Sequence, residues 1–155
     1  MEQIGKGMIS TCFYCSKSNT VIKQYNKDYF KNNHCAIVQH FKNDVATLKK
    51  FSGTLHFPTL ISVNDNEKTI VMSYCGPRLI KENLPSNWKE QCKEMEQSFK
   101  QANLFHNDVF CKNMAVFNNI ISIFDFGMTV STPNQYNGIE LIIQRELING
   151  EPKNE

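Results

Sequence analysis

The first quarter of the chain alternates short β-favouring runs with turn-forming residues. Strands are predicted at about Gln3 to Ile4, Ile9 to Cys15 and Thr20 to Tyr25. The breaks between them, Gly5-Lys6-Gly7 and Lys17-Ser18-Asn19, contain the glycine and small polar residues that are typical of turns. Short strands joined by tight turns predict an antiparallel meander.

A long amphipathic helix and two further strands are predicted next. Apolar residues recur at helical spacing over about His34 to Phe51, and Ser52-Gly53 ends the pattern. The residues of this stripe are Ile37, Phe41, Val45, Leu48 and Phe51. Strands then follow at Leu60 to Val63 and Thr69 to Tyr74. We therefore expect a five-stranded antiparallel sheet with one long helix.

The second half of the chain is mostly helical in pattern. After Cys75-Gly76-Pro77, a helix is predicted to open at Pro85-Ser86, and a hairpin to run from Met114 to Phe117 and from Ile120 to Phe124 around Asn118-Asn119. The apolar stripe of the helix is Trp88, Cys92, Met95, Phe99 and Ala102. A last helical stripe is formed by Ile139, Ile142, Ile143 and Leu147. The expected fold class is α+β.

Composition and charge narrow the classes of partner. The 155 residues carry a formal net charge of +2 without a long run of like charges, so we expect neither nucleic acid nor a membrane as a partner. The first residues lack the apolar core of a signal peptide, and no stretch is apolar enough to span a bilayer. We therefore expect a cytoplasmic protein with a single domain over residues 1–155.

The cysteines are scattered without the spacing of a disulfide framework, which favours free thiols in a reducing compartment. Cys12 and Cys15 form one C-x-x-C pair. Residues three apart on a strand point to opposite faces, however, and no second pair follows at zinc-like spacing. We interpret the pair as part of a strand rather than as a metal site.

The strongest chemical signal lies in the second half of the chain. The stretch HNDVFCKN, which ends at Asn113, is followed by the predicted hairpin and then by Asp125-Phe126-Gly127. Order and spacing match H-x-D-x-x-x-x-N and D-F-G. In phosphoryl transfer one carboxylate accepts the proton of the acceptor hydroxyl, while an amide and a second carboxylate hold magnesium against the triphosphate. Asp108 is thus the predicted catalytic base, and Asn113 and Asp125 are the predicted metal ligands.

The predicted hairpin has a geometric role, because it returns the chain so that Asp125 lies beside Asn113. His106 belongs to the same motif. A core histidine with satisfied hydrogen bonds is nevertheless commoner than a catalytic one. Both interpretations of His106 stay open at this point.

A glycine-containing segment near the start fits the same chemistry. In IGKGMISTCFYC, Gly5 and Gly7 would let the backbone approach phosphate groups closely, because a Cβ atom there would collide with them. Val21-Ile22-Lys23 follows on the next predicted strand. Lys23 is therefore the predicted phosphate-contacting lysine.

From about Ile4 to Gly127 the chain resembles the protein-kinase-like superfamily, above all the small atypical or viral kinases with a reduced C-lobe. The resemblance implies a two-lobe fold, with the sheet in an N-lobe at about 1–75 and a mostly helical C-lobe with a small hairpin at about 76–155. It also implies ATP as the nucleotide, Mg²⁺ or alternatively Mn²⁺ as the ion, and, for a viral member, the host cytoplasm as the compartment. Met72 would lie beside the adenine pocket. The implied ATP-binding residues are Ile4, Gly5, Lys6, Gly7, Cys12, Val21, Lys23, Met72, Tyr74 and Cys75, and the implied catalytic residues are Asp108, Lys23, Asn113 and Asp125.

The partner of Lys23 departs from the kinase pattern. Kinases pair this lysine with a glutamate of the long helix, but no glutamate occurs between Glu2 and Glu67. Asp44 is the candidate partner, because it lies on the apolar stripe one turn before Leu48. A carboxylate buried on such a stripe is unfavourable unless it is paired. The alternative is an acidic residue at the solvated edge of the helix. Both stay open.

The segment after Gly127 is short, so we expect the last helix to pack across the Trp88 helix as a minimal C-lobe. Remaining apolar surface is expected to be buried in a homodimer or against a partner. Asn107 replaces the arginine that would bind a phosphate on an activation loop, which argues against that type of switching.

The motifs together predict a phosphotransferase that moves the γ-phosphate of ATP to a hydroxyl, with a serine or threonine of a protein as the expected acceptor. Two alternatives stay open. One is a pseudokinase that binds nucleotide as a scaffold without turnover, which would have no need of Asp108. The other is a kinase of a sugar, lipid or antibiotic hydroxyl, since such enzymes share the two motifs, and the phosphate machinery does not identify the acceptor.

Overall fold

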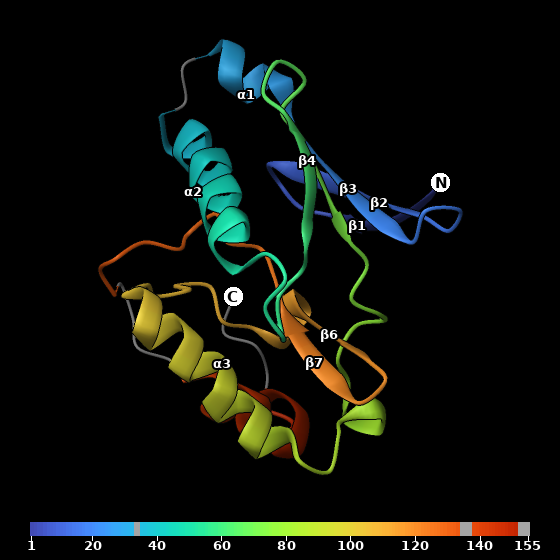
Figure 1. The fold of residues 1–155 in the computed structure, drawn as a ribbon, viewed down its shortest axis with the longest axis vertical. Helices are drawn as coiled ribbons and strands as arrows, with labels where there is room; N and C mark the ends of the chain where they lie inside the picture. Colours follow the sequence, from blue (N-terminus) through green and yellow to red (C-terminus); the bar gives the residue numbers. More distant parts are fainter. Residues whose placement is uncertain (33–34, 134–137, 152–155) are drawn as a thin grey trace. The chain divides into compact units, whose positions relative to one another are not determined.

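The computed structural model of the protein describes residues 1–32, 35–133 and 138–151. These residues form two compact units, Met1–Tyr74 and the part of the chain from Cys75 onward. Figure 1 shows their helices and strands. The first unit holds a five-stranded antiparallel sheet, and the second combines helices with a two-stranded hairpin. The α+β class and the five-stranded sheet predicted from the sequence are confirmed.

The sheet of the first unit has the strand order β1-β2-β3-β5-β4, and its neighbouring strands are antiparallel. The strands are β1 Glu2–Lys6, β2 Ser10–Cys15, β3 Thr20–Tyr25, β4 Leu60–Asn64 and β5 Thr69–Ser73. β3 lies at the centre, and its buried residues alternate with less buried ones. Because successive side chains of a strand point to opposite faces, Val21, Lys23 and Tyr25 share the buried face of β3.

β1 is longer than the sequence predicts. A break was expected at Gly5-Lys6-Gly7, but Gly5 pairs with Cys12 inside the sheet. A register shift between Gln3 and Gly5 accommodates one extra residue, as in a β-bulge. Glycine inside a strand often marks such a bulge, and the turn therefore begins only at Gly7.

The predicted long helix is α2, Cys35–Phe51. The helix start predicted at His34 lies outside the described residues. Val45, which the apolar pattern placed on the stripe, is only half-buried, and Asp44 takes the buried position instead. The buried residues of α2 are Ile37, Phe41, Asp44, Thr47, Leu48 and Phe51. Asp44 belongs to this face because it lies three residues after Phe41.

A short helix precedes α2 that the sequence pattern did not predict. It is α1, Lys27–Lys31, and it contains no buried residue. The Asn26 side chain accepts the N–H of Asp28 at 3.0 Å and so caps its first turn. A helix this short and this exposed carries no apolar period from which it could be recognised.

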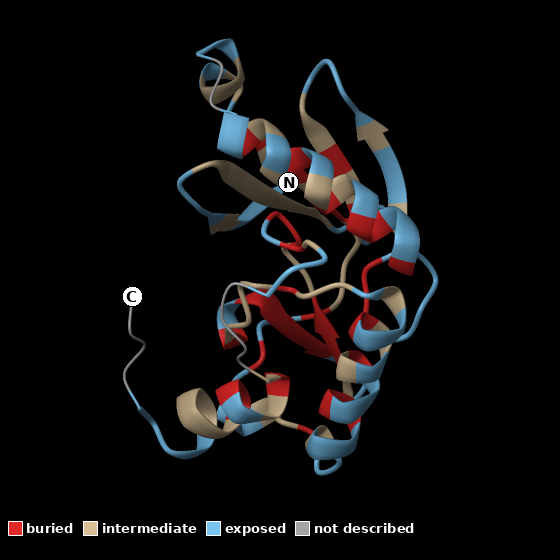
Figure 2. Cartoon of the chain, turned by 90° about the vertical axis from the view of Figure 1, so that its left-hand side faces the viewer, coloured by how far each residue is buried: buried red, intermediate tan, exposed pale blue. Residues whose placement is uncertain are grey.

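The second unit is built on helix α3, Trp88–Ala102, and on the hairpin of β6, Met114–Phe117, and β7, Ile120–Ile123. Buried residues line the hairpin strands and one face of α3 (Figure 2). Asn118 and Asn119 have φ angles of 48° and 61°, the left-handed conformations of a type I′ hairpin turn. The predicted hairpin and its turn are confirmed.

The buried face of α3 differs from the predicted stripe at its ends, because Trp88 and Ala102 are only half-buried. Gln91 is buried instead: its side-chain oxygen accepts the N–H of Ile121 at 2.8 Å, and its amide donates to the Asn119 carbonyl at 2.7 Å. These bonds satisfy a buried polar side chain and tie α3 to the hairpin. The apolar residues of α3 that are buried as predicted are Cys92, Met95 and Phe99.

The last predicted helix consists of α4, Ile139–Ile143, and the π-helical turn η3, Gln144–Ile148. Glu96 of α3 accepts the N–H of Ile139 at 2.8 Å, and α3 and α4 are in contact. The buried residues of α4 are Ile139, Ile142 and Ile143. The predicted packing of the tail across α3 is confirmed, although Leu147 is only half-buried.

Two short 3₁₀ turns complete the second unit, η1 Lys81–Asn83 and η2 Cys111–Asn113. The six cysteines are free thiols, and Cys12 and Cys15 both lie on β2, as the strand interpretation of that pair predicts. Within the described ranges, no helix combines the length and the apolar character that crossing a bilayer requires.

Candidate functional site

Gly5 and Gly7 lie at the end of β1. The N–H of Gly7 donates to the Ser10 carbonyl at 2.8 Å, which closes a tight turn into β2. A Cβ atom added at Gly5 would lie 3.7 Å from Cys12 Cβ, and one at Gly7 would lie 3.6 Å from the Ser10 carbonyl oxygen. These are ordinary van der Waals distances, and neither glycine has a positive φ. Folding of the first unit therefore does not require glycine at either position.

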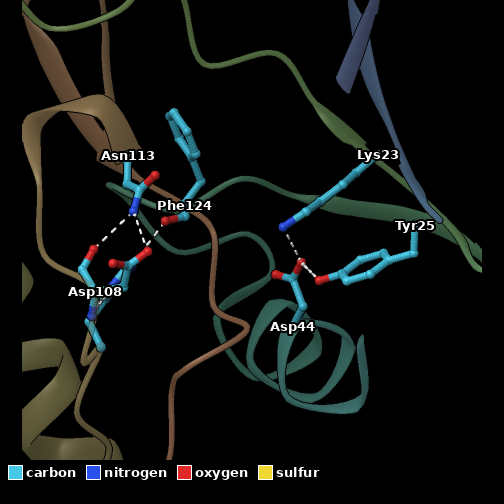
Figure 3. Close-up of polar contacts among 7 residues, drawn as sticks. Lys23, Tyr25, Asp44, Asp108, Asn113 and Phe124 are labelled. Carbon is cyan, nitrogen blue, oxygen red and sulfur yellow. Dashed lines mark hydrogen bonds and ion pairs between the residues drawn. The ribbon is translucent and has the colours of Figure 1, made fainter. Parts of the chain in front are cut away.

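Lys23 and Asp44 form a buried ion pair in the first unit (Figure 3). Lys23 Nζ lies 2.7 Å from Asp44 Oδ2, and the two side chains are 5% and 1% exposed. Tyr25 Oη donates a second hydrogen bond to the same oxygen at 2.8 Å. A buried carboxylate is strongly unfavourable unless a cation and hydrogen bonds compensate it, and both are present here. Of the two alternatives for Asp44, the structure contains the ion pair.

The elements explain why these three side chains meet. Lys23 and Tyr25 are two residues apart on β3, so their side chains leave the same face of the sheet. Asp44 lies on the buried face of α2. The sequence predicted roles for Lys23 and Asp44 but not for Tyr25. The signal that could have identified Tyr25 is its position on the same strand, two residues after Lys23.

Met72 and Tyr74 are two of the residues for which the sequence predicts contact with adenine. Met72 is buried on β5 and is the register partner of Val21 on β3. The Tyr74 ring lies 4.3 Å from the Tyr14 ring, and partial burial raises the pKa of the Tyr74 phenol, with Tyr14 adding to the shift. The N–H of Tyr74 donates to the Asn19 carbonyl at 3.2 Å. The backbone N–H of this predicted ATP-binding residue is therefore engaged within the first unit.

The remaining predicted nucleotide contacts differ in exposure. Ile4 is 46% exposed at the bulge of β1, and Lys6 is exposed at the end of that strand. Cys12 on β2 is half-buried and is the register partner of Lys23. Cys75 is the first residue of the second unit.

In the second unit, a closed circuit of hydrogen bonds joins the HNDVFCKN loop to the residue after β7; Figure 3 shows Asp108, Asn113 and Phe124 of this circuit. The N–H of Asp108 donates to His106 Nδ1 at 3.2 Å, and His106 Nε2 lies 2.9 Å from the Phe124 carbonyl oxygen. The N–H of Phe124 donates to the Asn113 carbonyl at 3.0 Å. Asn113 Nδ2 then donates to the carbonyl oxygen and to Oδ2 of Asp108, both at 2.9 Å. The circuit thus holds Asp108, Asn113 and the residue before Asp125 together.

His106 is buried, and both of its ring nitrogens have hydrogen-bond partners. Because an N–H of the backbone points at Nδ1, this nitrogen is the acceptor, and Nε2 carries the proton that is donated to Phe124. The ring packs edge-on against Phe99 and Phe126, with centroid distances of 5.9 and 5.5 Å. Of the two interpretations of His106, the structure favours the satisfied core histidine, which here connects two functional candidates.

Asp125 follows the circuit directly and has an uncommon backbone conformation. Its φ of 65° lies in the left-handed region, which few residues other than glycine adopt. The Asp125 side chain is half-buried, whereas Phe126 is fully buried at 0% exposure. Backbone conformations of this kind cluster at functional sites, where the surrounding structure maintains them.

Asn113 and Asp125 offer the oxygen ligands that Mg²⁺ prefers. The amide nitrogen of Asn113 is committed to Asp108, so its amide oxygen is the group that is left to act as an acceptor. Mg²⁺ is usually held by one or two carboxylates together with substrate phosphates and water. A protein cage is therefore not required, and the described part of the chain has no cluster of three or more His, Cys, Asp or Glu residues suited to one. The two residues fit magnesium that is bound together with a nucleotide.

The tail supports the HNDVFCKN loop from the opposite end of the sequence. Glu146 of η3 accepts the N–H of Cys111 at 2.9 Å, and Cys111 is 1% exposed. This N–H opens the η2 turn, where a backbone donor lacks a partner within the turn. Sequence reasoning missed Glu146, because a contact across so many residues leaves no local pattern.

Asn107 attaches the segment after Asp125-Phe126-Gly127 to the same loop. Its amide nitrogen donates to the carbonyls of Met128 and Thr132 at 3.1 and 3.0 Å. Phe105 and Val130 add an antiparallel backbone bridge nearby. Asn107 thus holds this segment through uncharged hydrogen bonds.

No protein-family model matches the chain, and no curated protein does. What these residues do is therefore inferred from their chemistry and their geometry.

Proposed function

We propose that the protein is an ATP- and magnesium-dependent phosphotransferase that moves the γ-phosphoryl group of ATP to a hydroxyl. The observation that carries the proposal is the hydrogen-bond circuit through Asp108, His106, Phe124 and Asn113. A carboxylate and an amide are held there beside the residue that precedes Asp125. Phosphoryl transfer needs this combination, because its catalysis consists almost entirely of positioning and charge stabilisation.

Asp108 is the proposed general base. The hydrogen bond from Asn113 to Oδ2 orients its carboxylate, and the side chain is only half-buried, so that an acceptor can approach. As the acceptor oxygen bonds to the γ-phosphorus, its proton passes to Asp108, and the bond to the β–γ bridging oxygen breaks to leave ADP. We propose a serine or threonine of a protein as the acceptor.

Asn113 and Asp125 are the proposed ligands of the magnesium ion. When bound, the ion supplies the positive charge that neutralises the phosphates during transfer. The role of the two residues is to present an amide oxygen and a carboxylate at fixed positions. The hydrogen-bond circuit helps to fix these positions. The N–H of Phe124, the residue directly before Asp125, donates to the Asn113 carbonyl.

In the first unit, Lys23 is the proposed phosphate contact. The ion pair with Asp44 keeps its ammonium group in one position and compensates its charge in a buried setting. Gly5 and Gly7 support the same assignment, since packing within the unit does not explain them, whereas close approach of a phosphate to the backbone would.

We further propose that the two units are the lobes of a protein-kinase-like fold, with Val21, Met72 and the backbone near Cys75 around the adenine. The boundary between the units, after Tyr74, agrees with this proposal, as does the presence of a sheet with one long helix in the first unit. Under this proposal each unit supplies one half of the chemistry.

The test is to incubate the protein with γ-labelled ATP and magnesium, alone and with panels of proteins and of small hydroxyl compounds. Label on serine or threonine is the expected result. Label on a metabolite would instead identify a small-molecule kinase. Nucleotide binding without any transfer would identify a pseudokinase and contradict the proposal.

A further inference from the structure

We infer that Tyr25 is a positioning residue for phosphoryl transfer, whose hydroxyl fixes Asp44 and, through Asp44, the ammonium group of Lys23. The inference rests on the proposed function, because that function assigns the nucleotide phosphates to Lys23. Tyr25 belongs to none of the sequence motifs described above, and its role comes from the geometry of the first unit.

Two donors converge on one buried oxygen. Lys23 Nζ and Tyr25 Oη lie 2.7 and 2.8 Å from Asp44 Oδ2, and Asp44 and Tyr25 are each 1% exposed. Lys23 Nζ also lies 5.2 Å from the centre of the Tyr25 ring, within the range of a cation–π interaction. The Lys23 ammonium group therefore contacts both the Asp44 carboxylate and the ring of Tyr25, and the Tyr25 hydroxyl is hydrogen-bonded to the same carboxylate.

The hydroxyl, rather than the ring, distinguishes Tyr25 from an ordinary core residue. Its ring packs edge-on against Phe41 at a centroid distance of 5.3 Å and against Phe30 at 6.3 Å. A phenylalanine would make the same ring contacts. A buried hydroxyl is unfavourable unless it is hydrogen-bonded, and here it is bonded to Asp44.

The short side chain of Asp44 explains the need for a second donor. Hydrogen bonds to charged groups are shorter and stronger than those between neutral groups, so the bond from Tyr25 restricts rotation of the carboxylate. The position of Lys23 Nζ then follows from that of Asp44 Oδ2. A glutamate at position 44 would be one methylene longer, and in a buried site that both donors already reach at hydrogen-bond distance it would be overpacked.

The first experiment compares Tyr25→Phe with Tyr14→Phe, because Tyr14 also donates a hydrogen bond, to Asn19, but at an exposed position. Titration calorimetry measures the affinity of the full chain for ATP with magnesium and for adenosine. Tyr25→Phe is expected to weaken ATP binding by roughly tenfold and to leave adenosine binding unchanged, because the hydroxyl acts through Lys23 on the phosphates. Tyr14→Phe is expected to change neither affinity.

A second pair of variants tests whether the effect of Tyr25→Phe on ATP binding is due only to lost packing. Asp44→Glu alone is expected to weaken ATP binding, and adding Tyr25→Phe should restore part of it, because removal of the hydroxyl makes room for the longer side chain. The effect of Tyr25→Phe thus reverses its sign between the aspartate and glutamate backgrounds. The same loss in both backgrounds would show that the hydroxyl does not act through residue 44.

The remaining outcomes separate the inference from the proposed function. If the wild-type chain binds neither ATP nor adenosine, the proposed function fails and the inference fails with it. If the wild type binds ATP and Tyr25→Phe binds it equally well, or loses ATP and adenosine affinity to the same extent, the inference alone is overturned.

Discussion

Asp125 combines the carboxylate proposed to bind magnesium with a backbone φ of 65°. Asparagine and aspartate accept this left-handed conformation better than other non-glycine residues, so alanine at this position would add backbone strain to the loss of charge. Asparagine at position 125 separates the two effects, because it removes the charge and keeps the conformation.

Magnesium is expected to increase the ATP affinity of the wild type. We predict that Asp125→Asn reduces the factor of this increase by about tenfold or more, with little change in thermal stability. The measurement is the ratio of ATP affinities with and without magnesium. Asp65→Ala, which removes an exposed carboxylate that pairs with Lys68, is the matched control and should leave the ratio unchanged. Wild-type protein that binds ATP equally with and without the ion would refute the assignment.

Asp44 and Tyr25 show how far single residues can be predicted from the sequence. The position of Asp44 on an apolar stripe made it a candidate partner of Lys23, beside the alternative of a solvated helix edge, and the structure contains the ion pair. Tyr25 gave no such signal, because tyrosine is common at buried strand positions. Its hydroxyl reaches Asp44 only when α2 packs against β3, and this tertiary contact leaves no local pattern in the sequence.

At the scale of elements, the π-helical turn η3 supports the HNDVFCKN loop through Glu146. Its carboxylate accepts the N–H of buried Cys111 at 2.9 Å, and leaving a buried N–H without a partner costs about 1–3 kcal/mol. We predict that Glu146→Ala lowers the free energy of unfolding by about that amount and reduces turnover more than it reduces ATP affinity.

Thermal unfolding and steady-state kinetics measure these effects. Glu146→Gln keeps an acceptor oxygen and should lose less. Glu151→Ala removes only an exposed contact with Arg145 and should change stability by less than about 1 kcal/mol. Equal stability of Glu146→Ala and Glu151→Ala would show that the contact does not support the loop.

Elements with a strong local signal were predictable, whereas those that depend on neighbours were not. The Asn118-Asn119 turn and the apolar period of α2 are encoded in adjacent residues, and both appear where the sequence predicts them. The extent of β1 depends on pairing of Gly5 with β2, which overrides the turn preference of glycine. Trp88 is only half-buried because it is the first residue of α3, whereas Gln91 is buried because the hairpin supplies its partners.

At the scale of the whole molecule, the tail determines whether the second unit has a closed core. Ile142 is 3% exposed, whereas its neighbour Leu141 is 51% exposed. Truncation of a buried isoleucine to alanine costs about 2–5 kcal/mol, and surface substitutions usually stay within about 0.5 kcal/mol. We predict that Ile142→Ala strongly destabilises the protein in denaturant unfolding and that Leu141→Ala does not.

Deleting the residues after Thr132 should have a larger effect than either substitution. Helix α3 would lose its contact with α4, and Cys111 would lose Glu146. The truncated chain is therefore expected to be insoluble or unfolded. A soluble and active truncation would contradict the role of the tail.

The central claim, phosphoryl transfer with Asp108 as the base, is tested most directly by measuring turnover and ATP affinity of Asp108→Ala beside the wild type. A general base contributes about 10²–10⁴-fold to the rate and acts on the acceptor rather than on the nucleotide. The expected result is a loss of labelled phosphate transfer of that size, with ATP affinity nearly unchanged. Transfer by Asp108→Ala at a rate near that of the wild type would contradict the claim.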